Sequence, residues 1–376
     1  MTRPVYVAGV GLHRYQRSSE ASFVTLGLAA VRAALADAGA EWSDVQGVYT
    51  GTTRLGMAVS RPMLRHLGAT GVAMTQVENA SASSSSAFRL ACMEVSSGEA
   101  DIVLAMGVDK PGPSSRAESR TGLTGLADGH VVPFTRFAML ANEYMHRHGA
   151  TPEQVAAVAV KNHRNGARNP YAHHQKERDL AEVLDAEPVA GTLTKWQCCP
   201  VGEGASAVVV ASEDALARLG GDPSRAVRVR ASAQRSERLY GDGDFDVEIT
   251  RETTAEALHR AAVRPADLDV IELHDAFAIE ELRYVEAMGL CADGQAAGRL
   301  ADGEFDVGGR CAVSPSGGLI AMGHPIGPTG TGQIAEVARQ LRGEAGDRQQ
   351  PGARLGLAHM VGVGAVCVVH VLEAAE

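Results

Sequence analysis

The sequence lacks the features of nucleic-acid-binding and membrane-spanning proteins. Acidic residues outnumber basic ones, 45 against 35, which gives a formal net charge of −10. Binding to phosphate backbones needs a basic surface, so this balance argues against nucleic acid as a partner. No apolar run reaches the roughly 18 residues that span a bilayer, so we expect no membrane association.

Cysteine patterns and targeting signals are also missing. Six cysteines in 376 residues are too few and too scattered for a disulfide framework. Only Cys198 and Cys199 are adjacent, so zinc-ligand spacing is absent and we expect no metal. The N-terminus runs directly into a strand pattern and the C-terminus carries no retention or peroxisomal address. We therefore expect a cytoplasmic, reducing location.

What is present is the alternation of strand and helix signals that predicts an α/β protein. The composition, 45% hydrophobic and 21% charged, is that of a globular chain large enough for two or three domains. An apolar run at 5–11 predicts a buried strand, and apolar residues at helical spacing over 24–35 predict a helix that ends at Gly39. Residues 44–49 predict the next strand.

The same order returns later in the chain and indicates an internal duplication. Residues 227–231 predict a strand, and the capping box Thr253-x-x-Glu256 predicts the start of a helix. Two stretches recur at the same spacing: Ala34-Leu35-x-x-Ala38 with Ala257-Leu258-x-x-Ala261, and Asp44-Val45-x-x-Val48 with Asp267-Leu268-x-x-Ile271. We expect a first half at 1–225, which includes an inserted loop domain at 113–195, and a second half at 226–376.

The insertion contains one well-defined helix signal. Thr151-Pro-Glu-Gln is a capping box with proline at the first helical position, so it predicts a helix over 151–164. His173 and His174 follow among arginines, and they fit either a solvated face or a phosphate contact. Residues 203–212 then predict a strand that completes the first sheet.

A serine cluster marks the first candidate site. Residues 75–79 predict a strand and 88–95 a helix, with serines at 81–86 at their junction. Backbone N–H groups at a helix N-terminus are unsatisfied and stabilise an anion, which favours a nucleophile there. The alternative is a serine-rich N-cap with no chemistry.

Three further motifs lie in the second half. His274 ends a predicted strand within 271–282, and His324 lies in a glycine- and proline-rich loop within 313–335 that leads into a helix. Either histidine alone fits a capping or satisfied loop residue. Near the C-terminus, the backbone N–H groups of Gly362 and Gly364 are candidate oxyanion donors. His359 is either structural or part of the pocket.

These motifs resemble those of the thiolase superfamily, in the same order. Gly-Gly-Leu-Ile-Ala-Met-Gly-His-Pro-Ile-Gly-Pro-Thr-Gly, around His324, resembles its active-site histidine loop. Val77-Glu-Asn-Ala-Ser81-Ala-Ser resembles its nucleophile motif, with Ser81 in place of cysteine. His274-Asp-x-Phe resembles the branch related to sterol carrier protein. The resemblance implies two βαβαβαββ halves in a five-layered α-β-α-β-α sandwich, with a loop domain that covers the site and contacts coenzyme A.

The resemblance also implies roles for the site residues. Ser81 takes the acyl group, His324 acts as base, and His274 with His324 stabilises the oxyanion. Both family cysteines are missing, because the usual acid/base position is Ala276. A serine hydroxyl needs a positioned general base, and no Asp or Glu that orients His324 is evident. Ser81 forms an acyl-enzyme, or serves a non-covalent pocket, or replaces a natural cysteine to trap a complex.

Three functions follow from this reading. The first is a thiolase-like acyl-CoA acyltransferase of lipid metabolism, which uses a coenzyme A thioester as substrate and no covalently bound cofactor. The alternative is a catalytically impaired acyl-CoA-binding subunit of a hetero-oligomer with a small OB-fold partner. The third is a thioester retro-aldol lyase. The resemblance also implies a homodimer that forms through the sheet of the first half.

Overall fold

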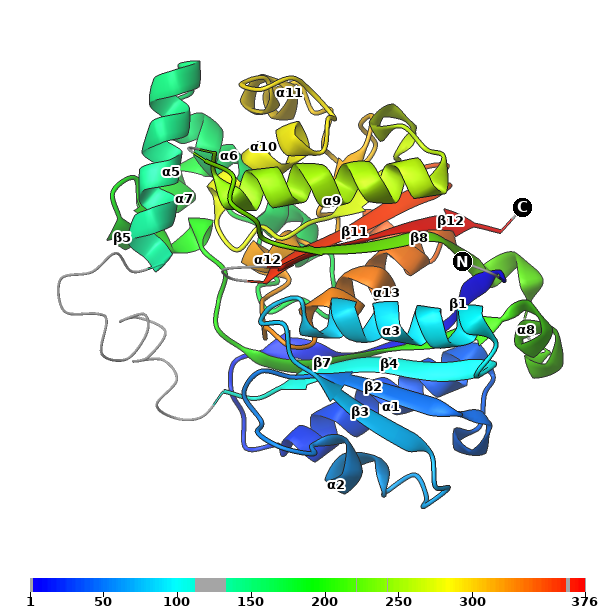
Figure 1. Cartoon of the computed structure of the whole chain (residues 1–376). Coiled ribbons are helices and arrows are strands. Elements are labelled where there is room, and N and C mark those ends of the chain that lie inside the picture. Colours follow the sequence, from blue (N-terminus) through cyan, green and yellow to red (C-terminus); the bar gives the residue numbers. More distant parts are fainter. Residues whose placement is uncertain (1–2, 112–132, 221, 242, 363–365, 376) are drawn as a thin grey trace.

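The fold is a layered α/β sandwich built from two similar halves (Figure 1). The computed structural model describes residues 3–111, 133–220, 222–241, 243–362 and 366–375. Hydrogen bonds connect ten strands in the order β10-β9-β11-β12-β8-β1-β7-β4-β2-β3. Each half contributes five consecutive strands of this order, so the predicted fold class is confirmed.

The first half builds the lower sheet in Figure 1. Its strands are β1 (Val5–Gln16), β2 (Gly47–Gly51), β3 (Ala73–Val77), β4 (Ile102–Asp109) and β7 (Glu203–Ser212). Its helices are α1 (Phe23–Ala38), α2 (Ser60–Leu64), α3 (Ser83–Ser97) and α8 (Glu213–Leu219). β2 pairs in parallel with β3 and β4, and β7 pairs antiparallel with β4 and β1. The predicted strand at 203–212 therefore completes this sheet.

The second half repeats that order strand for strand. Its strands are β8 (Val227–Ser236), β9 (Val270–Glu272), β10 (Ala312–Val313), β11 (Leu355–Gly362) and β12 (Val366–Ala374). Its helices are α9 (Phe245–Ala261), α10 (Ala278–Ala287), α11 (Ala296–Ala301), α12 (Gly318–Ala321) and α13 (Thr329–Leu341). β9 is parallel to β10 and β11, as β2 is to β3 and β4.

The two sheets enclose a shared helical layer. α3 and α13 lie between them, with α1 beneath the lower sheet and α9 above the upper one (Figure 1). The sheets join where β1 pairs antiparallel with β8. Because helices cover both faces, central strands are apolar along their whole length, and every residue of β4 is buried.

The inserted segment packs beside the second half. Its described elements are α5 (Pro133–His148), α6 (Pro152–Ala167), α7 (Leu180–Leu184), β5 (Pro188–Ala190) and β6 (Leu193–Thr194). α6 begins as predicted, because the Thr151 hydroxyl accepts from the Gln154 N–H and the Gln154 side chain accepts from the Thr151 N–H. Residues 113–132 of the predicted loop domain lie outside the described residues, and its boundaries stay a prediction.

One predicted helix start is wrong. α9 begins eight residues before Thr253, where the Asp244 carboxylate accepts from the N–H groups of Asp246 and Val247. Thr253 lies inside the helix and donates its hydroxyl to the carbonyl of Ile249, four residues earlier, at 2.7 Å. A threonine within a helix commonly bonds in this way, so the pattern at Thr253 does not mark the terminus.

The predicted strand at 44–49 also begins too early. Trp42–Asp44 forms a short 3₁₀ turn, and Pro265–Asp267 forms the matching turn in the second half. In each, an aspartate carboxylate accepts the N–H three residues earlier: Asp44 from Glu41 at 2.8 Å and Asp267 from Arg264 at 2.9 Å. The duplication therefore extends to a local turn. Within the described part of the chain, no helix combines the length and apolarity needed to cross a bilayer.

Candidate active site

Ser81 lies in a tight turn between β3 and α3. The preceding residue, Ala80, has a positive φ of 49°, a left-handed conformation that is unfavourable for a residue with a side chain. The turn is held by the Asn79 N–H, which donates to the Ser83 hydroxyl at 2.9 Å, and by the Ala82 N–H, which donates to the Asn79 carbonyl at 3.0 Å. Ser81 is only 3% exposed. Local strain is thus concentrated next to the candidate nucleophile.

His324 meets Ser81 across the boundary between the halves. The Ser81 hydroxyl lies 3.0 Å from Nε2 of His324, within hydrogen-bonding distance. On the other side of the ring, Nδ1 lies 2.9 Å from the hydroxyl of Thr329 at the start of α13. Both ring nitrogens therefore have defined partners, and the imidazole plane is fixed.

The environment keeps the His324 ring neutral. Burial lowers the pKa of His324 well below its ordinary value, and the nearby His274 and Arg54 lower the pKa further. A neutral ring with a proton on Nδ1 donates to the Thr329 hydroxyl and leaves Nε2 to accept the proton of Ser81. The contact thus has the geometry of a general base and its nucleophile.

His274 is the second imidazole at this place. It follows β9, and its ring centre lies 5.4 Å from that of His324, with the two planes at 89°. Nδ1 lies 3.2 Å from Oε1 of Glu280, whose other oxygen accepts from the N–H of Phe277 at 2.9 Å. Nε2 of His274 is buried and has no partner among the described residues. This nitrogen is therefore free for a substrate oxygen.

His359 supports His274 from β11. Its Nδ1 accepts the backbone N–H of His274 at 3.4 Å, and its Nε2 contacts the Thr250 hydroxyl at 3.0 Å. Burial and the neighbouring His274 lower the pKa of His359 to about 3. With both nitrogens occupied and the side chain fully buried, His359 is part of the support for the site.

The glycine-rich turn near the C-terminus is only partly described. A Cβ on Gly362, the last residue of β11, would lie 2.4 Å from the Asn79 carbonyl, so only glycine lets this strand approach the nucleophile turn. Gly364 lies outside the described residues. Cys367 is buried in β12, and burial raises the pKa of its thiol to about 12, as expected for a core residue.

Sequence reasoning missed three features of this site. Glu280 and Thr329 were not selected, although they follow the two histidines by six and five residues. The third feature is the segment from Cys198 to Val201. Cys198 forms an isolated β-bridge with Phe277, and Val201 forms one with His324, so this segment contacts both histidine motifs. Burial raises the pKa of the Cys198 thiol to about 12, so this cysteine is no ready thiolate.

Fold and site together define an α/β protein of duplicated halves with a hydroxyl–imidazole pair between them. A family model described as the thiolase N-terminal domain matches residues 12–179, and one described as thiolase C-terminal domain-like matches residues 231–374. The chain therefore belongs to the thiolase family.

Named relatives resemble the chain along nearly its whole length. Sterol carrier protein 2 of Gallus gallus is 36% identical over 391 residues, covering 98% of this chain and 71% of that protein. Benzoylsuccinyl-CoA thiolase subunit BbsB of Thauera aromatica is 36% identical over 374 residues, covering 97% and 96%. Acetyl-CoA acetyltransferase of Methanothermobacter thermautotrophicus is 34% identical over 382 residues, covering 99% and 100%. The thiolase-family relatives thus include acyltransferases.

Solved structures agree on the fold. The structure titled Ltp2-ChsH2(DUF35) aldolase matches with a TM-score of 0.82 and 26% identity, covering 100% of this chain and 99% of that chain. Human mitochondrial 3-ketoacyl-CoA thiolase matches with a TM-score of 0.75 and 18% identity, covering 100% of both chains. The second likeness concerns the fold alone.

Proposed function

We propose that this chain is an acyl-CoA acyltransferase that takes an acyl group from an acyl or 3-oxoacyl thioester onto Ser81. The observation that carries the proposal is the 3.0 Å contact between the Ser81 hydroxyl and Nε2 of His324. A serine hydroxyl is a weak acid and needs a base in contact during attack, and this contact supplies one. Coenzyme A enters as part of the substrate, as in the names of two relatives.

Ser81 and His324 together account for the bonds and the proton that change in the acyl-transfer step. As the Ser81 oxygen bonds to the thioester carbon, its proton passes to Nε2 of His324. The C–S bond then breaks, and His324 returns the proton to the leaving sulfur, which departs as the coenzyme A thiol. With a 3-oxoacyl thioester, the serine attacks the 3-oxo carbon, the C2–C3 bond breaks, and the same proton goes to the released C2.

His274 serves the oxygen that becomes negative in this step. Glu280 orients the His274 ring through its contact with Nδ1, and Nε2 is left as the donor to the oxyanion. The backbone N–H groups at the start of α3 and around Gly362 and Gly364 are further candidate donors. Burial of the site strengthens each of these interactions.

Two other functions keep specific support. A catalytically impaired acyl-CoA-binding subunit of a hetero-oligomer is favoured by the relative named as a thiolase subunit and by the loss of both family cysteines. A thioester retro-aldol lyase is favoured by the similarity to the aldolase structure, whose title also names a DUF35 partner. That title supports a DUF35 companion for either function, in the place of the small OB-fold partner expected from the sequence.

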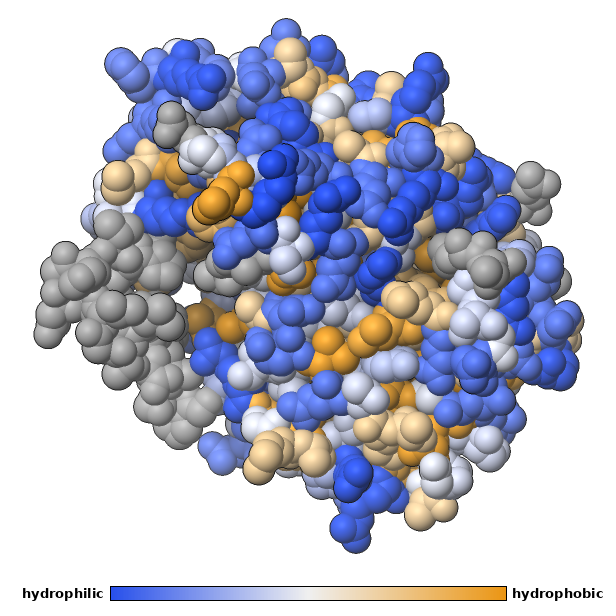
Figure 2. All heavy atoms as spheres, in the orientation of Figure 1, coloured by the Kyte–Doolittle hydropathy of each residue, from blue (hydrophilic) through white to orange (hydrophobic). Residues whose placement is uncertain are grey.

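A second copy of the chain is the other expected partner. β3 is the last strand of the lower sheet, with one side unpaired by any described strand, and an exposed edge strand offers backbone groups for pairing. Met93 on the neighbouring α3 is 52% exposed. Figure 2 shows hydrophobic residues gathered on the front face over α3 and β3. These features support a homodimer through the first half.

Mass spectrometry after incubation with acyl-CoA thioesters tests the proposal. We expect an acyl adduct on the peptide that contains Ser81, and none in Ser81→Ala. An unlabelled wild type that binds coenzyme A as tightly as Ser81→Ala would support the binding subunit and contradict the transferase. Ser81→Cys restores a more acidic nucleophile and is expected to raise thioesterase or thiolase activity.

A further inference from the structure

His324 has no carboxylate at Nδ1, although the imidazolium that forms during acyl transfer needs stabilisation. Its partner there is the neutral Thr329 hydroxyl. Burial and the positive charges of His274 and Arg54 all disfavour the protonated form of His324. A buried base in such surroundings works better when a negative charge reaches it through hydrogen bonds.

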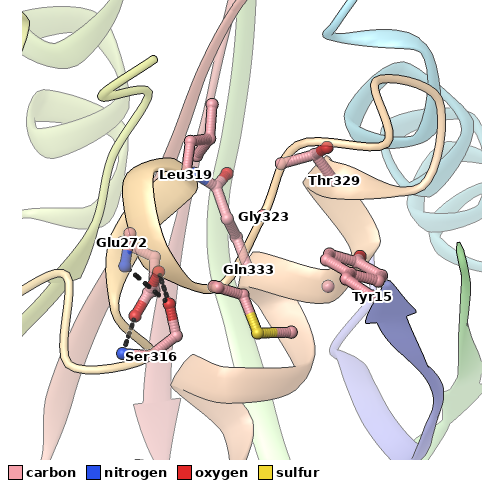
Figure 3. Close-up of a pocket in the computed structure, with 10 residues that line it drawn as sticks. Tyr15, Glu272, Ser316, Leu319, Gly323, Thr329 and Gln333 are labelled. Atoms are coloured by element: carbon pink, nitrogen blue, oxygen red, sulfur yellow. Dashed lines mark hydrogen bonds between the residues drawn. The ribbon is translucent and has the colours of Figure 1, made fainter. Parts of the chain in front are cut away.

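Thr329 is one of the residues that line a small cavity (Figure 3). It leaves about 10 Å³ for the centre of a water molecule, close to the smallest space that holds one water. The lining includes Thr329 and Gln333 of α13, Glu272 of β9, Ser316, and Tyr15 of β1. Most of the cavity wall is apolar, but Thr329, Gln333, Glu272 and Ser316 bring hydrogen-bonding groups to it, and the space holds at most one ordered water.

The polar groups of the cavity wall fit such a water. Both side-chain atoms of Gln333, Oε1 and Nε2, are buried and have no partner among the described residues. Thr329 and Gln333 are four residues apart on α13 and therefore share a helix face. Buried amides are nearly always hydrogen-bonded, so this pair of unpaired atoms calls for a partner in the cavity.

Glu272 supplies the carboxylate on the opposite wall. Its Oε1 accepts the N–H of Ser316 at 2.8 Å and its Oε2 accepts the hydroxyl of Ser316 at 2.7 Å (Figure 3). Each carboxylate oxygen accepts two hydrogen bonds, so both keep capacity for a further donor. Glu272 is 1% exposed.

We propose that one buried water in this cavity, held by Gln333, links the Thr329 hydroxyl to Glu272, so that Glu272 is the positioning carboxylate of His324. The chain of contacts runs from the Ser81 hydroxyl to His324, then through Thr329 and the water to Glu272. The proton of Ser81 stays on Nε2 of His324, and the relay orients and stabilises the imidazolium without taking that proton. The activity readout of this inference rests on the proposed function, but the geometry does not.

The charge on Glu272 depends on groups from every element packed around it. Burial raises the pKa of Glu272 to about 8, the charge of Glu336 on α13 raises it, and Lys161 on α6 lowers it. Asp275 and Tyr15 are the other titratable neighbours that interact with this carboxyl. The relay is therefore weakest below pH 8, where Glu272 is neutral, and strongest above it.

The rate of Ser81 acylation against pH tests the relay. In the wild type we expect the acylation rate to rise with pH, with a midpoint near pH 8. In Glu272→Gln we expect no such rise and a rate about ten-fold lower at pH 9. The effect is of this size because the charge acts through two intervening groups, Thr329 and the water. Glu286→Gln is the matched control, since Glu286 is a buried carboxylate that contacts Tyr144 and lines no part of the cavity. The effects of Glu272→Gln and Thr329→Val should not be additive.

A second measurement separates the relay from the transferase activity. In histidine-labelled protein, the NMR signal of the His324 Nδ1–H, assigned by its loss in His324→Gln, should move with a midpoint near pH 8 in the wild type and not in Glu272→Gln. If Glu272→Gln does not fold, Gln333→Met is the substitute variant. It removes a hydrogen-bonding partner of the water and should likewise abolish the movement of the signal near pH 8. If the His324 signal still moves near pH 8 in both Glu272→Gln and Gln333→Met, the relay is wrong. If the signal moves as expected in the wild type but Ser81 is not acylated, only the proposed transferase activity is wrong.

Discussion

Strand ends from both halves lie near the loop of His324, but their polar groups are hydrogen-bonded to different extents. In the first half, Asp109 at the end of β4 accepts from the side chains of Thr52 and Thr53 beyond β2 and from three backbone N–H groups. In the second half, His274 beyond β9 keeps a buried nitrogen unpaired. A saturated carboxylate builds structure, whereas an unpaired imidazole next to a hydroxyl–imidazole pair is available for chemistry.

The two ends are also connected. One of the five donors to Asp109 is the N–H of Gly327, three residues after His324, at 2.8 Å. The first half therefore anchors the loop on which the second half carries its base. Duplication thus provides the positions, while hydrogen-bond saturation decides that Asp109 anchors the loop and that His274 keeps a nitrogen available.

The largest expected effect is on catalysis in the second half. His324→Gln removes the group that accepts the Ser81 proton, so we expect acyl-adduct formation to fall by about 10²- to 10⁴-fold, the usual contribution of a general base. The measurement is the rate of adduct formation by mass spectrometry, with thermal unfolding as the control for folding. An unchanged rate would remove His324 from the mechanism.

The next effect is the acid sensitivity of the second sheet. Burial lowers the pKa of His359 in β11 and of His370 in β12 to about 3. The folded state keeps them neutral, so their stabilisation is present above pH 6.5 and is lost as the pH falls toward 3. Each should cost about 2 kcal/mol at pH 5, because one pKa unit is worth about 1.4 kcal/mol.

Denaturant titrations at pH 7 and pH 5 measure this loss. His370→Phe should lessen the difference by about 2 kcal/mol, because one ionising imidazole is removed and Phe also fits against Phe88, whose ring centre lies 4.9 Å from that of His370. If stability is the same at both pH values in the wild type, the buried imidazoles are not what distinguishes the second sheet.

The third effect tests the structural role of the first half. Asp109→Asn replaces one acceptor oxygen by an NH₂ group, so two of the groups that donate to it lose their acceptor. We expect a loss of about 3 kcal/mol in the free energy of unfolding, measured by denaturant titration. Thr52→Val, which removes a single donor, is the matched milder change. An Asp109→Asn protein of normal stability that lost only activity would reverse the comparison.

The smallest expected effect is a packing change where the halves meet. Gly362→Ala places a Cβ 2.4 Å from the Asn79 carbonyl, so the nucleophile turn or β11 must shift. We expect a loss of about 1–3 kcal/mol in unfolding free energy and slower acylation, measured by thermal melting and adduct formation. Gly98→Ala tests the strain of a left-handed glycine alone, since a Cβ there meets no atom within 4 Å.

The sequence by itself determined the elements and their duplication. Apolar spacing and caps such as Thr151 depend on neighbours a few residues away, so they can be read from a linear pattern. The motif order selected Ser81, His274 and His324, and Ser81 and His324 lie 3.0 Å apart in the structure. The error at Thr253 arose because a capping pattern inside a helix looks the same as one at its start.

Only the tertiary structure decided which groups complete the site. Ser81 and His324 are 243 residues apart, and the cavity that Thr329 lines brings β1, β9 and α13 together. Whether Asp109 is saturated or His274 Nε2 is left unpaired depends on donors brought together by folding, which no local spacing encodes. Hydrogen-bond saturation is a property of the three-dimensional neighbourhood, and it separates the structural role of Asp109 from the available imidazole of His274.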